Sequence, residues 1–381
     1  MKIPTSRPRA RRQAWLAVAA ASLLAVVAAC GSSASSDSSG SDSSDAPKPG
    51  TDKTVIAFVR TSSDTYQAAW QRGVKEVLSE QGYDVKFVEN NADQAEQNSQ
   101  VQQQVGTNKS PAAWVWMPSD AAAGAASLKA LHDTGLPVFQ VNQLPTKNTE
   151  QFITAYAGVN DVINGEASGE LVLKAKKQLE ATGQIATGDD AKVAVVKFYP
   201  GFAATINRLK GFEDVTKGKG IEIVASADDA VDATTGYQAA LSIIPVIKSK
   251  GVNIVYAQND ASASGVIRAL TESGFTPGKD VLVVGGNCRD DVSDLTSGRQ
   301  FGTGLQAAQL EGTFSAQMLV NYFANPAIKA GEYSAPATPD ALPEWPKEIS
   351  KFNYLPNPPI TADEVEDAKL WGQSMVDLCS Y

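Results

Sequence analysis

The sequence predicts an α/β protein of two lobes, each built on a doubly wound parallel sheet, with a cleft between them. Short apolar runs alternate with segments of helical periodicity, which indicates βαβ units and parallel sheets. The alternation runs once up to residue 141 and begins again at Asn160. About 330 residues follow the polar N-terminal part, too many for one small core and suited to two domains.

The first round of alternation begins at Thr54. Residues 54–59 are an apolar run bounded by polar residues, as in a buried strand. Residues 66–81 place Ala69, Val74 and Leu78 on one helical face, and a glycine ends the pattern. The other elements expected in this half are strands at 84–89, 113–116 and 137–141 and helices at 92–106 and 121–134.

The second round repeats the same order. We expect helices at 160–181, 203–217, 234–250 and 262–273, and strands at 191–197, 221–225, 253–256 and 281–284. Ligands of open parallel sheets bind beyond the carboxyl ends of the strands. The residues that directly follow each strand are therefore the candidates for function.

The N-terminus has the order of a secretory signal. Five basic residues precede an apolar run at 14–29, which ends in small residues before Cys30. The run is short for a membrane span, which needs about 20 apolar residues. A cysteine at this position resembles the lipobox of bacterial lipoproteins. That resemblance implies removal of residues 1–29 and a lipid on Cys30, which would anchor the chain to the outer face of the cytoplasmic membrane. The alternative is an ordinary signal or anchor that happens to contain a cysteine.

The segment after Cys30 cannot form a core. Residues 31–45 are almost entirely Ser, Asp, Gly and Ala. Such composition buries too little apolar surface to offset the entropy of folding. We therefore expect residues 30–53 to be a lipidated, flexible tether.

Charge argues against one class of partner. Removing the five basic residues of the signal, Lys2, Arg7, Arg9, Arg11 and Arg12, leaves 28 Lys and Arg against 42 Asp and Glu, a net charge of −14. Nucleic-acid binding needs a basic surface, so nucleic acid is not an expected partner.

Six short segments in order carry a resemblance to a known family. They are Asp64-Thr65-Tyr66-Gln67 before Gly73, Met117-Pro118-Ser119-Asp120, Gly135-Leu136-Pro137-Val138, residues 207–212, Ala257-Gln258-Asn259-Asp260, and residues 283–287. Together they resemble the type I periplasmic binding proteins of the ribose and galactose family, over about residues 54–323. The resemblance implies capture of a small sugar or polyol in the interlobe cleft and delivery to the permease of an ABC importer. It implies no cofactor, metal or catalytic residue.

The family's lobes are joined by three crossovers, a three-segment hinge. By resemblance these fall near Gly158, near Gln306 and within residues 336–359. The first lobe is then expected to comprise residues 54–157 plus 307–350. The second is expected to comprise residues 158–306 plus 351–381, with a last helix at 361–376.

The resemblance also points to a set of ligand-binding residues at the strand ends. Amide side chains supply both donors and acceptors for ring hydroxyls, and aromatic rings can wall the apolar faces of a sugar. For each amide taken singly, the alternative is a turn-capping or solvated loop residue. The set comprises Asp64, Tyr66, Gln67, Met117, Asn142, Gln143, Asn259, Asn287 and Gln306.

Several of these positions depart from the family pattern. Where sugar binders usually carry Asp and Arg after the fourth strand, this chain has Asn142 and Gln143, and Ile206 stands in place of an Arg of the second lobe. The charged fork that grips adjacent hydroxyls is therefore weakened, and a neutral ligand is expected. Arg208 is expected to support its helix rather than to touch the ligand.

Two cysteines remain once Cys30 carries lipid. Cys288 follows a strand of the second lobe, and Cys379 lies near the C-terminus, in a compartment that favours oxidation. We expect a disulfide between them. Two buried free thiols are the alternative.

An enzyme is the rival class of function. The single histidine, His132, is expected late in a helix and far from any strand end, and there is no G-x-S-x-G elbow and no metal-ligand spacing. A glycosidase that uses carboxylates alone remains open at this point. So does a binding protein that serves a membrane receptor instead of a permease.

Overall fold

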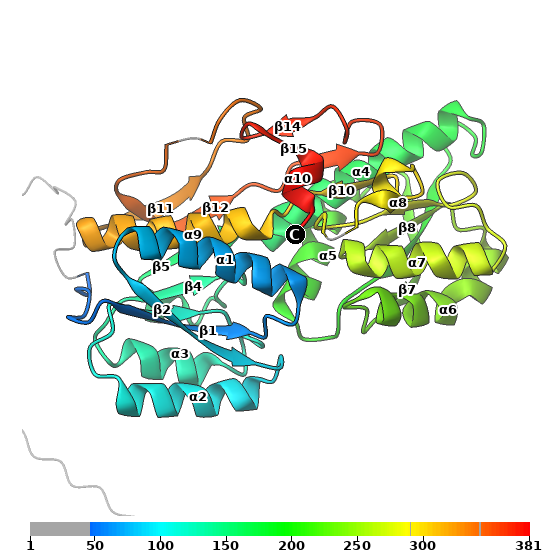
Figure 1. Cartoon of the computed structure of the whole chain (residues 1–381). Coiled ribbons are helices and arrows are strands. Elements are labelled where there is room, and N and C mark those ends of the chain that lie inside the picture. The colour runs from blue at the N-terminus through cyan, green and yellow to red at the C-terminus, as the bar shows by residue number, and fades with distance from the viewer. Residues whose placement is uncertain (1–45, 290, 343) are drawn as a thin grey trace, which may run out of the picture. The chain divides into compact units, whose positions relative to one another are not determined.

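The computed structural model describes residues 46–289, 291–342 and 344–381. The expected signal peptide, Cys30 and most of the expected tether lie outside these residues. Two parallel-sheet layers covered by helices form the described body, which confirms the predicted α/β architecture (Figure 1). No helix within the described residues is long and apolar enough to span a membrane.

The first lobe is built on a seven-stranded sheet with all strands parallel. Along β1 successive side chains face opposite sides of the sheet: Val55, Ala57 and Val59 enter one apolar core and Ile56 and Phe58 the other. Helices α1 and α9 cover one face, and α2 and α3 cover the other (Figure 1). The strand order is β11 (Ile328–Ser334), β12 (Ile349–Leu355), β5 (Ala155–Val159), β4 (Val138–Val141), β3 (Ala113–Trp116), β1 (Thr54–Arg60) and β2 (Asp84–Asn90). The helices are α1 (Thr65–Glu80), α2 (Gln94–Thr107), α3 (Ala125–His132) and α9 (Ala308–Ala324), with a 3₁₀ turn, η1, at Glu150–Phe152.

The second lobe repeats this plan on a six-stranded sheet. Its order is β13 (Pro359–Thr361), β10 (Gly302–Gly304), β9 (Leu282–Val284), β8 (Ile254–Ala257), β6 (Ala191–Val196) and β7 (Ile221–Ala227), and only the pairing of β13 with β10 is antiparallel among the described strands. Helices α4 (Asp161–Ala181) and α5 (Ala203–Thr216) pack together, as do α6 (Ala233–Lys250) and α7 (Asp260–Glu272). A short helix, α8 (Ser293–Thr296), follows β9.

Close packing of α4 on α5 fixes one wall of the later site. A Cβ on Gly165 of α4 would lie 2.0 Å from the carbonyl oxygen of Arg208, and one on Gly211 of α5 would lie 1.9 Å from that of Val162. Only glycine permits this approach, because any Cβ at these positions would overlap the neighbouring backbone. The crossing therefore sets the position of Arg208 against the first turn of α4.

Three connections join the two sheets. They lie between β5 and α4, between β10 and α9, and between β12 and β13. The first two fall at the predicted positions, near Gly158 and Gln306. The third lies between Leu355 and Pro359, so residues 351–355 belong to the first sheet rather than to the second lobe as expected.

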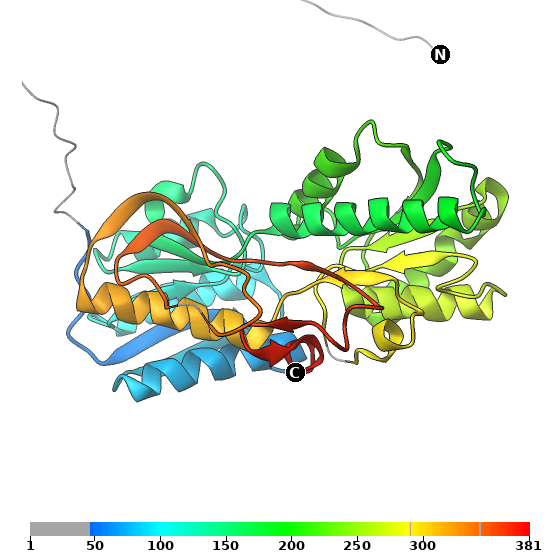
Figure 2. The same cartoon turned by 90° about the horizontal axis from the view of Figure 1, so that it is seen from above.

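The C-terminal segment differs from the single helix predicted at 361–376. It forms turns, a two-stranded hairpin of β14 (Lys369–Leu370) and β15 (Gln373–Ser374), and the short helix α10 (Met375–Cys379). Trp371 and Gly372 both have positive φ, 52° and 77°, which makes the hairpin turn and excludes a continuous helix. Figure 2 shows this segment, in red, running from the first sheet to the second and back to the hinge region.

The end of the expected tether is packed rather than flexible. Backbone amides of Gly50 and Asp52 donate to the carbonyls of Ala112 and Ser110, and the hydroxyl of Tyr322 donates to the carbonyl of Pro47. Ala46 packs against the core of the first lobe. Residues 46–53 therefore extend the first lobe, because their backbone groups find partners beside β3.

Candidate binding site

A cavity lies at the carboxyl ends of the strands, with walls from both lobes and the crossovers. Its empty volume is about 670 Å³, a figure that includes open solvent at its mouth. All the residues predicted from the sequence line it except Met117, which is fully buried in the core of the first lobe. The lining residues are Arg60, Asp64, Tyr66, Gln67, Asn142, Gln143, Asp161, Phe198, Tyr199, Phe202, Ala204, Arg208, Val231, Asn259, Asn287, Arg289 and Gln306.

The floor of the cavity is a hydrogen-bonded cluster around Glu311 of α9. The hydroxyl of Tyr66 donates to Glu311 Oε2, and Gln306 Nε2 donates to the same oxygen at 3.2 Å. Asn142 Nδ2 donates to Tyr66 Oη at 2.9 Å and to Glu311 Oε1 at 3.3 Å. Three donors converge on one carboxyl, so the cluster ties α1, β4 and the second crossover together.

Burial dominates the protonation of this cluster. It raises the pKa of Glu311, although the hydrogen bonds from Tyr66, Gln306 and Asn142 oppose the shift. Burial together with the adjacent Glu311 raises the pKa of Tyr66 well above its ordinary value. Tyr66 therefore remains a hydroxyl at neutral pH.

In Asn142 a positive φ of 63° places the side chain over this floor at the end of β4.

A buried ion pair forms the wall at the first crossover. Arg208 Nε donates to Asp161 Oδ1 at 2.8 Å, Nη1 donates to the carbonyl of Gln258 at 2.6 Å, and Nη2 donates to Gln306 Oε1 at 3.1 Å. The side chains of Arg208 and Asp161 are 5% and 3% exposed. Arg208 thus holds α5, β8 and the second crossover in register, in agreement with its expected supporting role, while also lining the cavity.

The two asparagines of the second lobe are partly committed to the backbone. Asn259 caps α7: its Oδ1 accepts from the amide of Ser262 at 2.7 Å, and its Nδ2 donates to the carbonyl of Ala230 at 3.4 Å. Asn287 Oδ1 accepts from the amide of Asp260 at 2.9 Å. Asn259 therefore has the capping role that the sequence analysis gave as the alternative to ligand binding.

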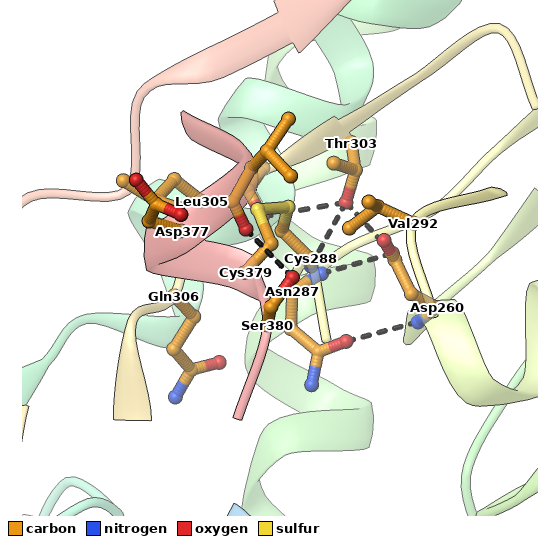
Figure 3. The surroundings of a disulfide bond; sticks show 12 residues. Asp260, Asn287, Cys288, Val292, Thr303, Leu305, Gln306, Asp377, Cys379 and Ser380 are labelled. Atoms are coloured by element: carbon orange, nitrogen blue, oxygen red, sulfur yellow. Dashed lines mark hydrogen bonds between the residues drawn. A yellow bond between two sulfur atoms is a disulfide. The ribbon is translucent and has the colours of Figure 1, made fainter. Parts of the chain in front are cut away.

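The loop after β9 is held from both sides (Figure 3). Cys288 and Cys379 form a disulfide, the pairing predicted from the sequence, which ties α10 to this loop. Asp260 Oδ1 accepts from the amides of Gly286 and Asn287 at 2.9 Å and 3.3 Å and from the hydroxyl of Thr303 at 2.7 Å. The loop carrying Asn287 is thus fixed relative to α7, β10 and the C-terminus.

Arg289 and Arg60 each make contacts between the two lobes across the cavity. Arg289 Nη2 donates to Asp64 Oδ2 at 3.2 Å and to Thr65 Oγ1 at 3.1 Å. The guanidinium of Arg60, at the end of β1, lies 5.0 Å from the ring centroid of Phe202. Phe198 and Tyr199 pack on Phe202 and complete an aromatic wall.

Sequence reasoning missed several of the lining residues, among them Arg60, Asp161, Phe198 and Arg289. The rule that function follows the strand ends could have found two of them, since Arg60 ends β1 and Asp161 follows β5 directly. Arg289 lies two residues beyond the predicted Asn287. Phe198 carries no sequence signal that separates it from a core residue.

Two lining amides have oxygens without a partner. Gln67 Oε1 and Gln143 Oε1 are buried and accept no hydrogen bond within the described part of the chain. These side chains are 3% and 1% exposed overall. A buried acceptor left unpaired is costly, so these oxygens suit hydroxyl donors of a bound molecule. No cluster of His, Cys, Asp and Glu able to hold a metal occurs among the described residues.

Comparison with known proteins gives consistent matches. A family model described as a periplasmic binding protein domain matches residues 55–326. The ribose import binding protein of Bacillus subtilis (strain 168) is 23% identical over 266 residues, which cover 69% of this chain and 79% of that protein. The galactofuranose-binding protein of Escherichia coli (strain K12) is 26% identical over 250 residues, 64% of this chain and 70% of that protein.

Solved structures share the fold. A galactofuranose binding protein superposes with a TM-score of 0.66 at 20% identity, covering 82% of this chain and 95% of that one. An ABC transporter solute-binding protein from Agrobacterium vitis, solved with bound D-fucose, superposes with a TM-score of 0.67 at 17% identity, covering 86% and 100%.

Proposed function

The chain belongs to the periplasmic binding protein family, and we propose that it captures a small neutral carbohydrate or polyol between its lobes and delivers it to an ABC transporter permease. The observation that carries the proposal is that Gln67 and Gln143, two residues that line the cavity, each have a buried amide oxygen without a partner among the described residues. They need donors, and the hydroxyls of a sugar supply them. The relatives, a ribose import binding protein and a galactofuranose-binding protein, point to the same ligand class.

Capture is favoured over catalysis by the state of the carboxyl groups. A glycosidase needs two carboxyls poised on either side of the scissile bond. Here Asp161 is paired with Arg208, Asp64 is paired with Arg289, and Glu311 accepts three hydrogen bonds beneath Tyr66. We therefore propose no catalytic residue.

Binding is proposed to close the lobes. Ligand contacts from the first lobe, such as Gln67, and from the second lobe, such as Asn287, form together only in the closed form. A ligand shifts the equilibrium through such differential contacts. A receptor could read closure as well as a permease can; a permease and an ATPase encoded beside this protein would favour import.

A thermal-shift screen of the purified protein against D-ribose, D-galactose, L-arabinose, D-fucose and myo-inositol tests the proposal. A true ligand at one hundred times its Kd should add about 2.7 kcal/mol of stability. Unchanged unfolding with every sugar and polyol, including galactofuranosides, would contradict capture of this ligand class.

Anchoring is a separate proposal that rests on the lipobox. We infer that the chain is exported and that Cys30 carries a lipid, which holds the body at the outer face of the cytoplasmic membrane. Mass spectrometry of the membrane fraction should find an N-terminal peptide that begins at a diacylated Cys30. A Cys30→Ala protein that is still cleaved and retained on membranes would refute lipidation.

A further inference from the structure

Arg60, the last residue of β1, lines the cavity and has two guanidinium nitrogens without a hydrogen-bond partner among the described residues. These nitrogens, Nε and Nη2, are buried. The side chain also forms no ion pair with any acid in the described ranges. Its observed contact is with the ring of Phe202 on the opposite lobe, at 5.0 Å.

The other two arginines of the cavity are engaged. Arg208 donates to Asp161, to Gln258 and to Gln306. Arg289 donates to Asp64 and Thr65. Of the three lining arginines, Arg60 is therefore the one whose Nε and Nη2 have no acceptor among the described residues.

A guanidinium with two buried nitrogens that lack hydrogen-bond partners is stabilised when a bound ligand supplies the acceptors. It cannot give up its proton, so it cannot escape the cost of burial by becoming neutral. Nε and Nη2 point to the same edge of the planar group and form a fork that fits two neighbouring oxygens. The two unpartnered nitrogens are this pair.

We propose that Arg60 grips two adjacent hydroxyls of the bound sugar and is a specificity-determining residue of this site. The inference rests on the proposed function and deepens it. The sequence led us to expect a weakened charged fork, because Asn142 and Gln143 follow the fourth strand. In this proposal Arg60 supplies such a fork from the end of β1 instead.

Two amide acceptors of residues that line the same cavity favour hydroxyls over a carboxylate as the oxygens that pair with Arg60. Gln67 Oε1 and Gln143 Oε1 both lack donors among the described residues. A hydroxyl can accept from Arg60 and donate to an amide oxygen at the same time, whereas a carboxylate only accepts.

The first arm of the test uses the purified protein without ligand. In Arg60→Met a buried group that lacks a partner is replaced by an apolar one, so the unfolding temperature should stay the same or rise. The matched control is Arg208→Met, which breaks a buried pair and should lower it clearly. A loss in Arg60→Met as large as in Arg208→Met would show that Arg60 is structural and would overturn the proposal.

The second arm measures the affinity of the wild type and of Arg60→Met for pairs of a sugar and its deoxy analogue. The ligands are D-ribose and 2-deoxy-D-ribose, D-galactose and 2-deoxy-D-galactose, and D-galacturonate. Any other sugar that shifts the unfolding temperature of the wild type is added, together with the deoxy analogues of that sugar. Arg60→Met should bind the wild type's sugar roughly ten- to a hundredfold more weakly. Removing one of the two hydroxyls from the sugar should weaken its binding to the wild type more than its binding to Arg60→Met. The deoxy sugar and the Arg60→Met substitution remove the same interaction, so their effects do not add. Arg60→Lys should not restore full affinity, because an ammonium lacks the fork.

The outcomes separate this inference from the function beneath it. Equal sugar affinity in wild type and Arg60→Met overturns the role of Arg60 and leaves sugar capture standing. Preference for D-galacturonate that disappears in Arg60→Met overturns the hydroxyl pair in favour of a carboxylate. A wild type that binds no sugar contradicts the proposed function, and with it the gripped hydroxyls.

Discussion

Arg208→Met is expected to lower the free energy of unfolding by about 3–5 kcal/mol. The substitution leaves the Asp161 carboxylate buried without its partner, and it removes the donors to Gln258 and Gln306. Burial disfavours the charged form of Arg208, but the adjacent Asp161 carboxylate outweighs this and raises the pKa of the guanidinium. Urea denaturation followed by circular dichroism measures the effect.

Arg268→Met is the control for Arg208→Met. Arg268 pairs with Glu272 on the exposed face of α7, where the two side chains are 68% and 48% exposed. Solvent screens such a pair, so little change in stability is expected. Equal and small effects of both substitutions would mean that Arg208 does not brace the hinge.

Removing the disulfide should cost up to about 4 kcal/mol, since the bond closes a loop whose ends are 91 residues apart. The double variant Cys288→Ala/Cys379→Ala is compared with the wild type by denaturant unfolding, with and without a reducing agent. The reducing agent should lower the unfolding midpoint of the wild type toward that of the variant and leave the midpoint of the variant unchanged. Two reactive thiols in the unfolded, unreduced wild type would refute the bond.

Loss of this bond should also loosen the site. Cys288 lies between Asn287 and Arg289, which line the cavity, and α10 holds them through Cys379. Tyr381 follows α10 and packs edge-on against Tyr66, with ring centroids 6.0 Å apart. Faster hydrogen exchange in the loop after β9 of the variant would report this loosening.

Periodicity predicted eight strands of the two sheets but missed β5, β10, β11, β12 and β13. Runs such as residues 54–59 and 253–256 were predictable because they are short, apolar and bounded by polar residues, as is typical of strands buried on both faces. The C-terminal segment escaped because helical spacing at 361–376 says nothing of the left-handed turn at Trp371 and Gly372. Its apolar side chains instead cover the hinge side of the core, a tertiary contact that no local pattern encodes.

The site was predictable to the extent that strand ends define it. Tyr66, Gln143 and Asn287 follow strands at short distance and line the cavity. Met117 also follows a strand, but its side chain packs into the core of the first lobe, which the position at a strand end does not reveal. The clustering of Glu311 with Tyr66 could not be read from the sequence, since 245 residues separate them.

The central claim, capture of one sugar between the lobes, is tested most directly by calorimetric titration of the wild type and Gln67→Ala with the sugar found by thermal shift. Gln103→Ala on the exposed face of α2 serves as the matched control. We expect one sugar to bind per chain, Gln67→Ala to bind it roughly ten- to a hundredfold more weakly, and the control to bind it as the wild type does. Binding by Gln67→Ala as tight as that of the wild type, or a stoichiometry other than one, would contradict this claim.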